Sequence, residues 1–431
     1  MHPVFSEFLE SGASPWRSLM QSAQLEVKQE AVTIKESGQK SEGPKRLVSL
    51  DAFRGTIMLL MLNEATRLGT VARSFPHSAI WNFIAFQTDH VDWQGCSLHD
   101  LIQPGFSFLV GAAMSFSIAN RKSKNQSFGQ LLGHALWRAF VLIFLGIFLR
   151  SIHHQQTYFT FEDTLTQIGL GYVFLFLLSF TRVRTQVIVA VLILAAFWGA
   201  FVLYPAPGPN FGYARVGVPT NWEHNYSGFL SHFNKNSNLS WAFDVWFLNL
   251  FPREQPFVYN EGGWSTLSFI PTLATMILGL LTGEWLKSNR SEGQKLRGLV
   301  IAGVGLVLAG LMFQWAGICP IVKRVWTSSY TLYSGGLVVL MLAGFYALIE
   351  WKGWRKWAFP LIVVGMNSIA IYLMAWTMEG FIYSALHVHF GRLIPALVSP
   401  TFLPVAYGIG VILTFWMILF WMYRRKIFLR I

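Results

Sequence analysis

Residues 187–204 decide the fold class of this chain, and they read VIVAVLILAAFWGAFVLY. This run has no charged side chain and is long enough, at about 1.5 Å per residue, to cross the hydrocarbon core of a bilayer as a helix. Similar apolar runs recur along the chain. Of all residues 53% are hydrophobic and only 13% are charged, whereas soluble domains carry about 25% charged residues. The sequence therefore predicts an all-α polytopic protein that is embedded in a lipid bilayer.

Working outward from this run, we predict a bundle of about ten to eleven transmembrane helices. The eleventh element is the stretch 380–400, which is apolar but broken by Pro395 and by two histidines. The ten predicted spans are 51–69, 101–120, 132–150, 165–181, 186–204, 266–286, 298–316, 328–349, 358–378 and 403–423.

Basic residues set the predicted orientation of the bundle. Lys and Arg are concentrated in the loops after the even-numbered spans and in the C-terminal segment. By the positive-inside rule, both termini then face the cytoplasm. The opposite side carries the polar stretch 89–95 and a long loop at 205–265, whose length is typical of a functional lid. The net charge of +12 is spread over short loops, so we expect no nucleic-acid partner.

Two regions differ in composition. Residues 1–44 are polar and mixed in charge, without the order of a cleavable signal peptide, and we predict a disordered cytoplasmic tail. Residues 45–431 form the predicted transmembrane domain. Cys96 and Cys319 lack the paired spacing of a disulfide framework or a zinc site, so we expect no bound metal and read each as a small apolar residue.

The stretch Asp89-His90-Val91-Asp92-Trp93-Gln94-Gly95 is a polar island between two apolar segments. A neutral imidazole can accept a proton from an amine or can itself attack a thioester. We expect Asp89 or Asp92 to orient the His90 ring and to favour its imidazolium form. A single histidine in a loop is usually inert surface, but its carboxylate, tryptophan and glycine neighbours favour proton or group-transfer chemistry at the membrane edge.

Further polar residues lie at or near the ends of the predicted spans. Asp51 and Arg54 are three residues apart, so they share a helix face and can pair. Arg54 either anchors the helix or offers a planar cation to an anionic cofactor at the cytoplasmic mouth. Asn63 lies roughly 13 Å further along the helix axis, where it serves either the active site or a bond between helices. Asp100 could cap the second span, and Asn367 needs a partner at lipid depth.

Together these motifs resemble one family, the transmembrane acyltransferases typified by heparan-α-glucosaminide N-acetyltransferase and its bacterial relatives. The resemblance extends over residues 46–425. It is carried by Leu50-Asp51-Ala52-Phe53-Arg54-Gly55, Asn63, His90-Val91-Asp92-Trp93-Gln94-Gly95, Asp100-Leu101-Ile102-Gln103-Pro104-Gly105-Phe106, Glu261-Gly262, Ser265-Thr266 and Gly365-Met366-Asn367-Ser368.

The resemblance implies that the domain at 45–431 is an acyltransferase that moves an acetyl group from cytoplasmic acetyl-CoA to an amino sugar or glycan on the other side. His90 would be the catalytic base or a transient acetyl carrier, supported by Asp92, and the Asn63 amide would donate to the oxyanion. The residues expected at the acetyl-CoA site are Arg54, Asp51, Arg138, Lys122 and Lys287.

An acceptor site is expected on the far side of the membrane. Its predicted residues are Trp93, Asp100, Glu261 and Asn367. Aromatic side chains of the 205–265 loop would either stack on a sugar ring or seat the loop at the interface. Those aromatic and histidine residues are Trp222, His224, Tyr226, Trp241, Trp246 and Trp264.

The chain also departs from the family. The segment between Arg67 and Gln87 is longer, and no large domain precedes the first span, which favours a bacterial protein of the inner membrane acting on a cell-surface or periplasmic glycan. Two other functions fit the residues. One is polysaccharide O-acylation with His90 as general base, and the other is a transporter without chemistry. Membrane enzymes of this kind are often dimers, so a homodimer is compatible with this interpretation.

Overall fold

The computed structural model describes residues 47–122 and 126–429. Within them the secondary structure is helical, apart from one isolated bridge between Gln94 and Val322. The all-α prediction is thus confirmed. The tail predicted at 1–44 lies outside the described residues.

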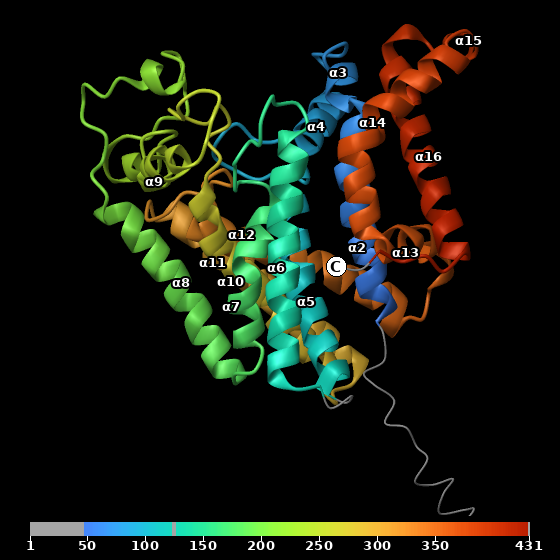
Figure 1. Ribbon diagram of the computed structural model, residues 1–431, viewed down its shortest axis with the longest axis horizontal. Helices are drawn as coiled ribbons and strands as arrows, with labels where there is room; N and C mark the ends of the chain where they lie inside the picture. Colours follow the sequence, from blue (N-terminus) through green and yellow to red (C-terminus); the bar gives the residue numbers. More distant parts are fainter. Residues whose placement is uncertain (1–46, 123–125, 430–431) are drawn as a thin grey trace, which may run out of the picture. The chain divides into compact units, whose positions relative to one another are not determined.

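Eight helices in the described ranges are long and apolar enough to cross a bilayer, which indicates an integral multi-pass membrane protein. Shorter helices also lie in the bundle (Figure 1), with fewer residues than the roughly 17–25 that a spanning helix needs. The long helices are α5 (Ile102–Lys122), α6 (Phe128–Ser151), α8 (Val183–Leu203), α10 (Phe269–Lys287), α11 (Glu292–Trp315), α12 (Ser328–Tyr346), α14 (Ser368–Phe390) and α16 (Leu403–Arg424), and the shorter ones are α2 (Val48–Leu62), α7 (Thr164–Leu178) and α13 (Phe359–Met366).

Two predicted spans are interrupted. The helix expected over 51–69 ends at Leu62 and continues as a 3-10 turn, η1 (Asn63–Thr66), before Arg67 adopts a left-handed conformation with φ 51°. The helix expected over 358–378 is divided at Asn367, whose φ of −126° and ψ of 43° are not helical. Most of the predicted stretch 380–400 therefore belongs to α14 and to the short α15 (Leu393–Leu397).

Small residues allow α5 and α10 to pack closely. A Cβ atom on Gly111 would overlap the Met276 carbonyl oxygen, and one on Gly279 would overlap that of Phe108. Glycine is therefore required at both crossing points, as expected for membrane helix interfaces. Helix α2 packs on α13 and also contacts α5 and α12, so its two ends place polar residues at opposite ends of the bundle.

The long loop at 205–265 folds into short helices at one end of the bundle (Figure 1), including η4 (Gly228–Phe233) and α9 (Leu239–Phe247). An apolar cluster lies beneath this loop, and in it Trp93 packs among aromatic side chains of α8 and the loop. Cys319 is a buried member of this cluster, as predicted for a small apolar residue.

Candidate active site

His90 lies in the loop between α4 (Ala79–Thr88) and the short η2 (His99–Leu101). Its Nδ1 atom is 2.7 Å from Oδ1 of Asp100, and its side chain is 29% exposed. The other carboxylate oxygen of Asp100 accepts hydrogen bonds from the backbone N–H of Ser97 and Val91 and from the Ser97 hydroxyl. The carboxylate is therefore held in place, and it fixes the orientation of the imidazole.

A lysine from a distant loop completes this arrangement. The Lys323 Nζ atom lies 3.2 Å from Oδ1 of Asp100 and 3.1 Å from Nδ1 of His90. Asp100 and Lys323 are both almost fully buried. Because the His90–Asp100 contact is the shortest, we assign the Nδ1 proton to His90, which donates it to Asp100, while Lys323 donates to the same carboxylate oxygen. This tautomer leaves a lone pair on Nε2 of His90.

The protonation of His90 follows from these neighbours. Burial lowers the pKa of His90 from its ordinary value of 6.5, and the charge of Lys323 lowers it further, while the hydrogen bond to Asp100 acts in the opposite direction. Burial also lowers the pKa of Lys323, and Asp100 opposes this shift. The expectation that Asp89 or Asp92 orients the ring is wrong, because Asp100 makes this contact and Asp89 accepts from the backbone N–H of His90 instead. The imidazolium form is not favoured either, because burial outweighs the hydrogen bond to Asp100. His90 is neutral near pH 7, as a base or a nucleophile must be.

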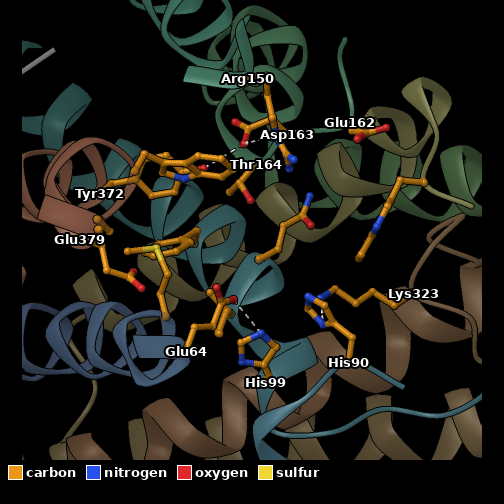
Figure 2. A pocket seen from close by; sticks show the side chains of 18 residues that line it. Glu64, His90, His99, Arg150, Glu162, Asp163, Thr164, Lys323, Tyr372 and Glu379 are labelled. Atoms are coloured by element: carbon orange, nitrogen blue, oxygen red, sulfur yellow. Dashed lines mark hydrogen bonds and ion pairs between the residues drawn. The ribbon is translucent and has the colours of Figure 1, made fainter. Parts of the chain in front are cut away.

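His90 faces a cavity of about 330 Å³, which we call the His90 cavity. Trp264 forms one wall, and its ring lies edge-on to His90 at a centroid distance of 5.5 Å. Figure 2 shows Arg150, Glu162 and Asp163 at the end of the cavity away from His90. Such a mixture of aromatic and charged walls suits a polar ligand.

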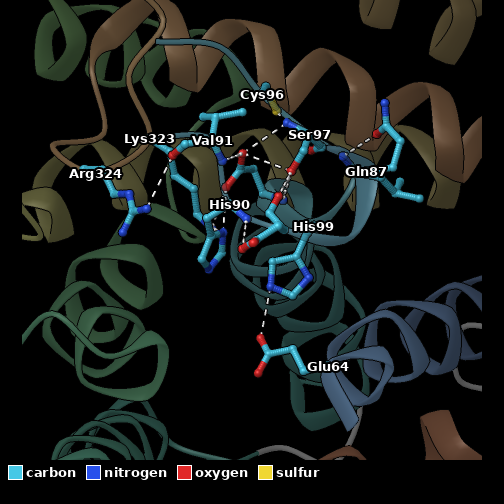
Figure 3. Close-up of polar contacts among 12 residues, drawn as sticks. Glu64, Gln87, His90, Val91, Cys96, Ser97, His99, Lys323 and Arg324 are labelled. Carbon is cyan, nitrogen blue, oxygen red and sulfur yellow. Dashed lines mark hydrogen bonds and ion pairs between the residues drawn. The ribbon is translucent and has the colours of Figure 1, made fainter. Parts of the chain in front are cut away.

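A second titratable pair faces the same cavity. Nε2 of His99 lies 3.0 Å from Oε1 of Glu64. The His99 ring is only 5% exposed, and its centroid is 4.4 Å from that of His90. Figure 3 shows this pair beside the His90 contacts. The carboxylate of Glu64 is thus held close to the neutral imidazole.

A larger cavity of about 710 Å³ lies toward the other ends of the same helices. Its wall includes Arg54, Arg121 and Arg138, and we call it the basic cavity. The two cavities share the side chains of Phe106, Thr164 and Tyr372. Phe106 and Tyr372 meet edge to face, and the Tyr372 hydroxyl donates to Asp163 at 3.0 Å. Thin aromatic packing therefore separates a cationic chamber from the imidazole.

Several predicted residues lie at these cavities. His90 lines the first cavity, while Arg54 and Arg138 line the second. The predicted pairing of Arg54 with Asp51 is confirmed at 3.1 Å. Asp100 contacts His90 and not the cavity, so its geometry differs from that of the predicted acceptor ligand.

Other predicted residues lie elsewhere. Asp92 contacts His224 and not His90. Its side chain is 75% exposed, and its carboxylate lies 3.7 Å from Nε2 of His224. Trp93 is fully buried and donates to the Phe233 carbonyl. Glu261 is exposed and absent from both cavity walls, and the nearby Trp264 lines the His90 cavity instead. The position of Asp92 therefore does not support His90. The positions of Trp93 and Glu261 do not indicate a contact with the acceptor.

The two predicted asparagines make contacts within the fold. The side-chain oxygen of Asn63 accepts from the Thr66 hydroxyl at 3.2 Å, and Asn63 lines neither cavity. Asn367 donates to the Ile427 carbonyl and accepts from the Leu429 N–H, so it fastens the C-terminal segment. Lys287 donates to the Ser115 carbonyl at 2.8 Å. The side chain of Lys122 is outside the described residues.

The aromatic residues of the long loop divide between two roles. Trp264 lines the His90 cavity. Trp222 and Tyr226 pack on the cluster around Trp93, and Trp241 donates to the Val258 carbonyl. Seating of the loop therefore accounts for these three residues. No group of three or more His, Cys, Asp or Glu side chains within 47–122 and 126–429 is placed to hold a metal ion.

Sequence reasoning missed Lys323, His99 and Glu64. Lys323 and Arg324 form a basic pair in a loop on the side that the positive-inside rule leaves poor in cations. The positive-inside rule does not explain this pair, so its presence in the sequence is a signal of a functional role. Glu64 is an acidic residue inside a predicted span, which is also a signal of function.

No family model matches the chain. It is 22% identical over 372 residues to the heparan-alpha-glucosaminide N-acetyltransferase of Homo sapiens, an alignment that covers 77% of this chain and 52% of that protein. It is 21% identical over 380 residues to the protein of the same name from Mus musculus, covering 78% of this chain and 54% of the relative. The chain therefore spans about half the length of the curated relatives it matches. The chain is thus similar, over more than three quarters of its length, to two heparan-alpha-glucosaminide N-acetyltransferases.

Proposed function

We propose that this protein is a transmembrane acyltransferase that moves an acetyl group from acetyl-CoA to an amino sugar or another glycan acceptor. One observation carries the proposal. A neutral imidazole, oriented by a buried carboxylate, faces a cavity that shares a wall with a second, cationic cavity at the other end of the bundle. The names of the two relatives supply the class of reaction.

The lone pair on Nε2 of His90 can serve either of two routes. As a base, it takes a proton from the amine while the amine nitrogen attacks the thioester carbonyl and the CoA thiolate leaves. As a carrier, Nε2 itself attacks the carbonyl and releases the thiolate, and the amine then displaces the imidazole from the acetyl group while its proton passes to the freed Nε2. Positive charge develops on the ring in both routes, and Asp100 stabilises it.

The basic cavity supports a donor site for the phosphates of acetyl-CoA. Guanidinium groups bind phosphate oxygens through paired hydrogen bonds. Arg138 lines this cavity, and its buried Nε atom has no hydrogen-bond partner among the described residues. Because the loops at this end are the predicted cytoplasmic ones, acetyl-CoA would enter from the cytoplasm and the acceptor from the opposite side.

The direct test of this function uses the purified protein with radiolabelled acetyl-CoA and glucosamine. Label on the sugar amine supports an N-acetyltransferase, whereas label on a hydroxyl group supports O-acylation. Failure to label any sugar, with acetyl and longer acyl donors alike, would contradict the proposal.

Replacing Arg138 with glutamine should raise the KM for acetyl-CoA by about 10-fold or more, because a hydrogen bond to a charged group contributes about 1.5–3 kcal/mol. The KM for acetyl-pantetheine, which lacks the nucleotide phosphates, should change little. Steady-state kinetics with both donors would measure this difference. An equal rise for both donors would contradict a phosphate contact.

The pH dependence of kcat should reflect the lowered pKa of His90. Because protonation removes the reactive lone pair, the acidic limb should lie below pH 6.5, the ordinary histidine value. The variant Lys323→Met should move this limb to higher pH, since it removes a positive charge and keeps Asp100. The ring also faces His99 and Trp264. The wild type and the Lys323→Met variant both retain these residues. A limb that does not move would argue against this role of Lys323.

A further inference from the structure

Glu64 is a charged side chain placed at the break after α2. In the 3-10 turn that follows Leu62 its side chain is 61% exposed, and it lines the His90 cavity. A continuous helix over 51–69 would have left it on a helix face at lipid depth. Figure 2 shows Glu64 turned toward the cavity, between His99 and Glu379 of α14.

His99 fixes one oxygen of this carboxylate. An ionised Glu64 accepts the Nε2–H of His99 at Oε1, over 3.0 Å. His99 is itself buried and packs against the His90 ring at 4.4 Å. The second oxygen, Oε2, has no hydrogen-bond partner among the described residues, so it is left for a ligand in the cavity that His90 also lines.

Charge is unevenly distributed around this part of the cavity. Lys323 stands behind His90, with Arg324 following it in the chain, and Arg324 donates to the Val91 carbonyl. Glu64 and Glu379 line the wall on the other side of the imidazole pair. A cationic ligand is therefore attracted to Glu64 and repelled from Lys323, which orients it across the imidazoles.

We propose that Glu64 binds the ammonium group of the acceptor and that His99 is a positioning residue that holds this carboxylate. The inference rests on the proposed acyltransferase function and narrows the acceptor to a primary amine. A protonated amine forms a charge-assisted hydrogen bond with a fixed carboxylate, whereas a hydroxyl group gains no ionic attraction there. Before transfer the bound ammonium group loses one proton to water, and the free amine then attacks the acetyl group by one of the routes given above. The site thus selects N-acylation over O-acylation.

The test compares Glu64→Gln, which removes the charge and keeps the shape, with Glu64→Asp and with Glu223→Gln. Glu223 is an exposed glutamate of the long loop and lines neither cavity, so it provides a matched control. Acceptors are glucosamine and glucose, and CoA release without acceptor is followed in parallel. We expect Glu64→Gln to raise the KM for glucosamine about 10- to 100-fold, with acceptor-free CoA release unchanged and partial recovery in Glu64→Asp.

His99→Gln keeps a donor for Glu64 and should raise the glucosamine KM less than His99→Ala does. If His99 had a purely structural role, His99→Ala would change kcat and KM together. His99→Gln would then show no rescue. An unchanged glucosamine KM in Glu64→Gln overturns the proposal. Equal use of glucose and glucosamine by the wild-type protein also overturns it, while leaving acyl transfer intact.

A binding measurement separates this inference from the proposed function. The probe is glucosamine in its protonated form, without acetyl-CoA so that it cannot be acetylated, titrated calorimetrically into the detergent-solubilised protein. Binding by the wild type and the Glu223→Gln variant, but not by Glu64→Gln, supports the ammonium site even if no acetyl transfer is detected. Equal binding by all three proteins, or binding by none of them, contradicts the ammonium site.

Discussion

Replacing His90 with alanine should lower acetyl transfer by about 10³-fold or more, because both proposed routes depend on its imidazole. The variant should remain folded in detergent. Asp100 and Lys323 still pair with each other at 3.2 Å, so the substitution leaves no buried charge without a partner. Turnover would be measured with radiolabelled acetyl-CoA, and folding by gel filtration and thermal unfolding.

His224→Ala is the matched control for this prediction. His224 is also a loop histidine near a carboxylate, but its side chain is 41% exposed and it lines neither cavity. It should retain activity. Mass spectrometry after incubation with acetyl-CoA alone separates the two roles of His90, since only a carrier would become acetylated. Near-normal turnover by a folded His90→Ala variant would remove His90 from the mechanism.

Asp100→Ala should give the largest loss of stability, about 3–5 kcal/mol, because it leaves the buried Lys323 without its counterion. Activity should also fall by about 10²-fold or more, since the imidazole loses the group that fixes its tautomer. The loss of stability would be measured as the shift in the unfolding midpoint in detergent.

The double variant Asp100→Ala/Lys323→Met separates the two effects. Removing both charges should recover most of the stability, because no uncompensated ion remains. It should not recover activity, because the imidazole is still unsupported. If Asp100→Ala is as stable as the wild type, the buried ion pair does not have the energetic role that its geometry indicates.

Most of the helices could be predicted from the sequence, because apolar runs such as 187–204 depend only on local composition. The interruptions could not. The break at Asn63–Thr66 and the break at Asn367 occur within apolar runs, and hydropathy alone does not distinguish a polar residue inside a helix from one that ends it. The first break matters most, since it turns Glu64 into the cavity.

His90 could also be singled out from the sequence as a candidate, because a titratable residue between two apolar segments stands out locally. Its partners could not. Asp100 fits the pattern of a helix cap equally well, and Asp92 is closer in the sequence although its carboxylate lies beside His224. Lys323 comes from a loop that follows α11 and meets His90 only through the packing of the bundle. Contacts between distant segments of this kind are not encoded in local patterns.

The central claim is that an acetyl group passes from the basic cavity to an acceptor in the His90 cavity at the opposite end of the bundle. Proteoliposomes with glucosamine sealed inside and radiolabelled acetyl-CoA added outside test it most directly. We predict labelled N-acetylglucosamine inside the vesicles with the wild-type protein and none with His90→Ala. Labelling only when donor and acceptor share a compartment would contradict transfer across the membrane, and labelling by His90→Ala would contradict the site.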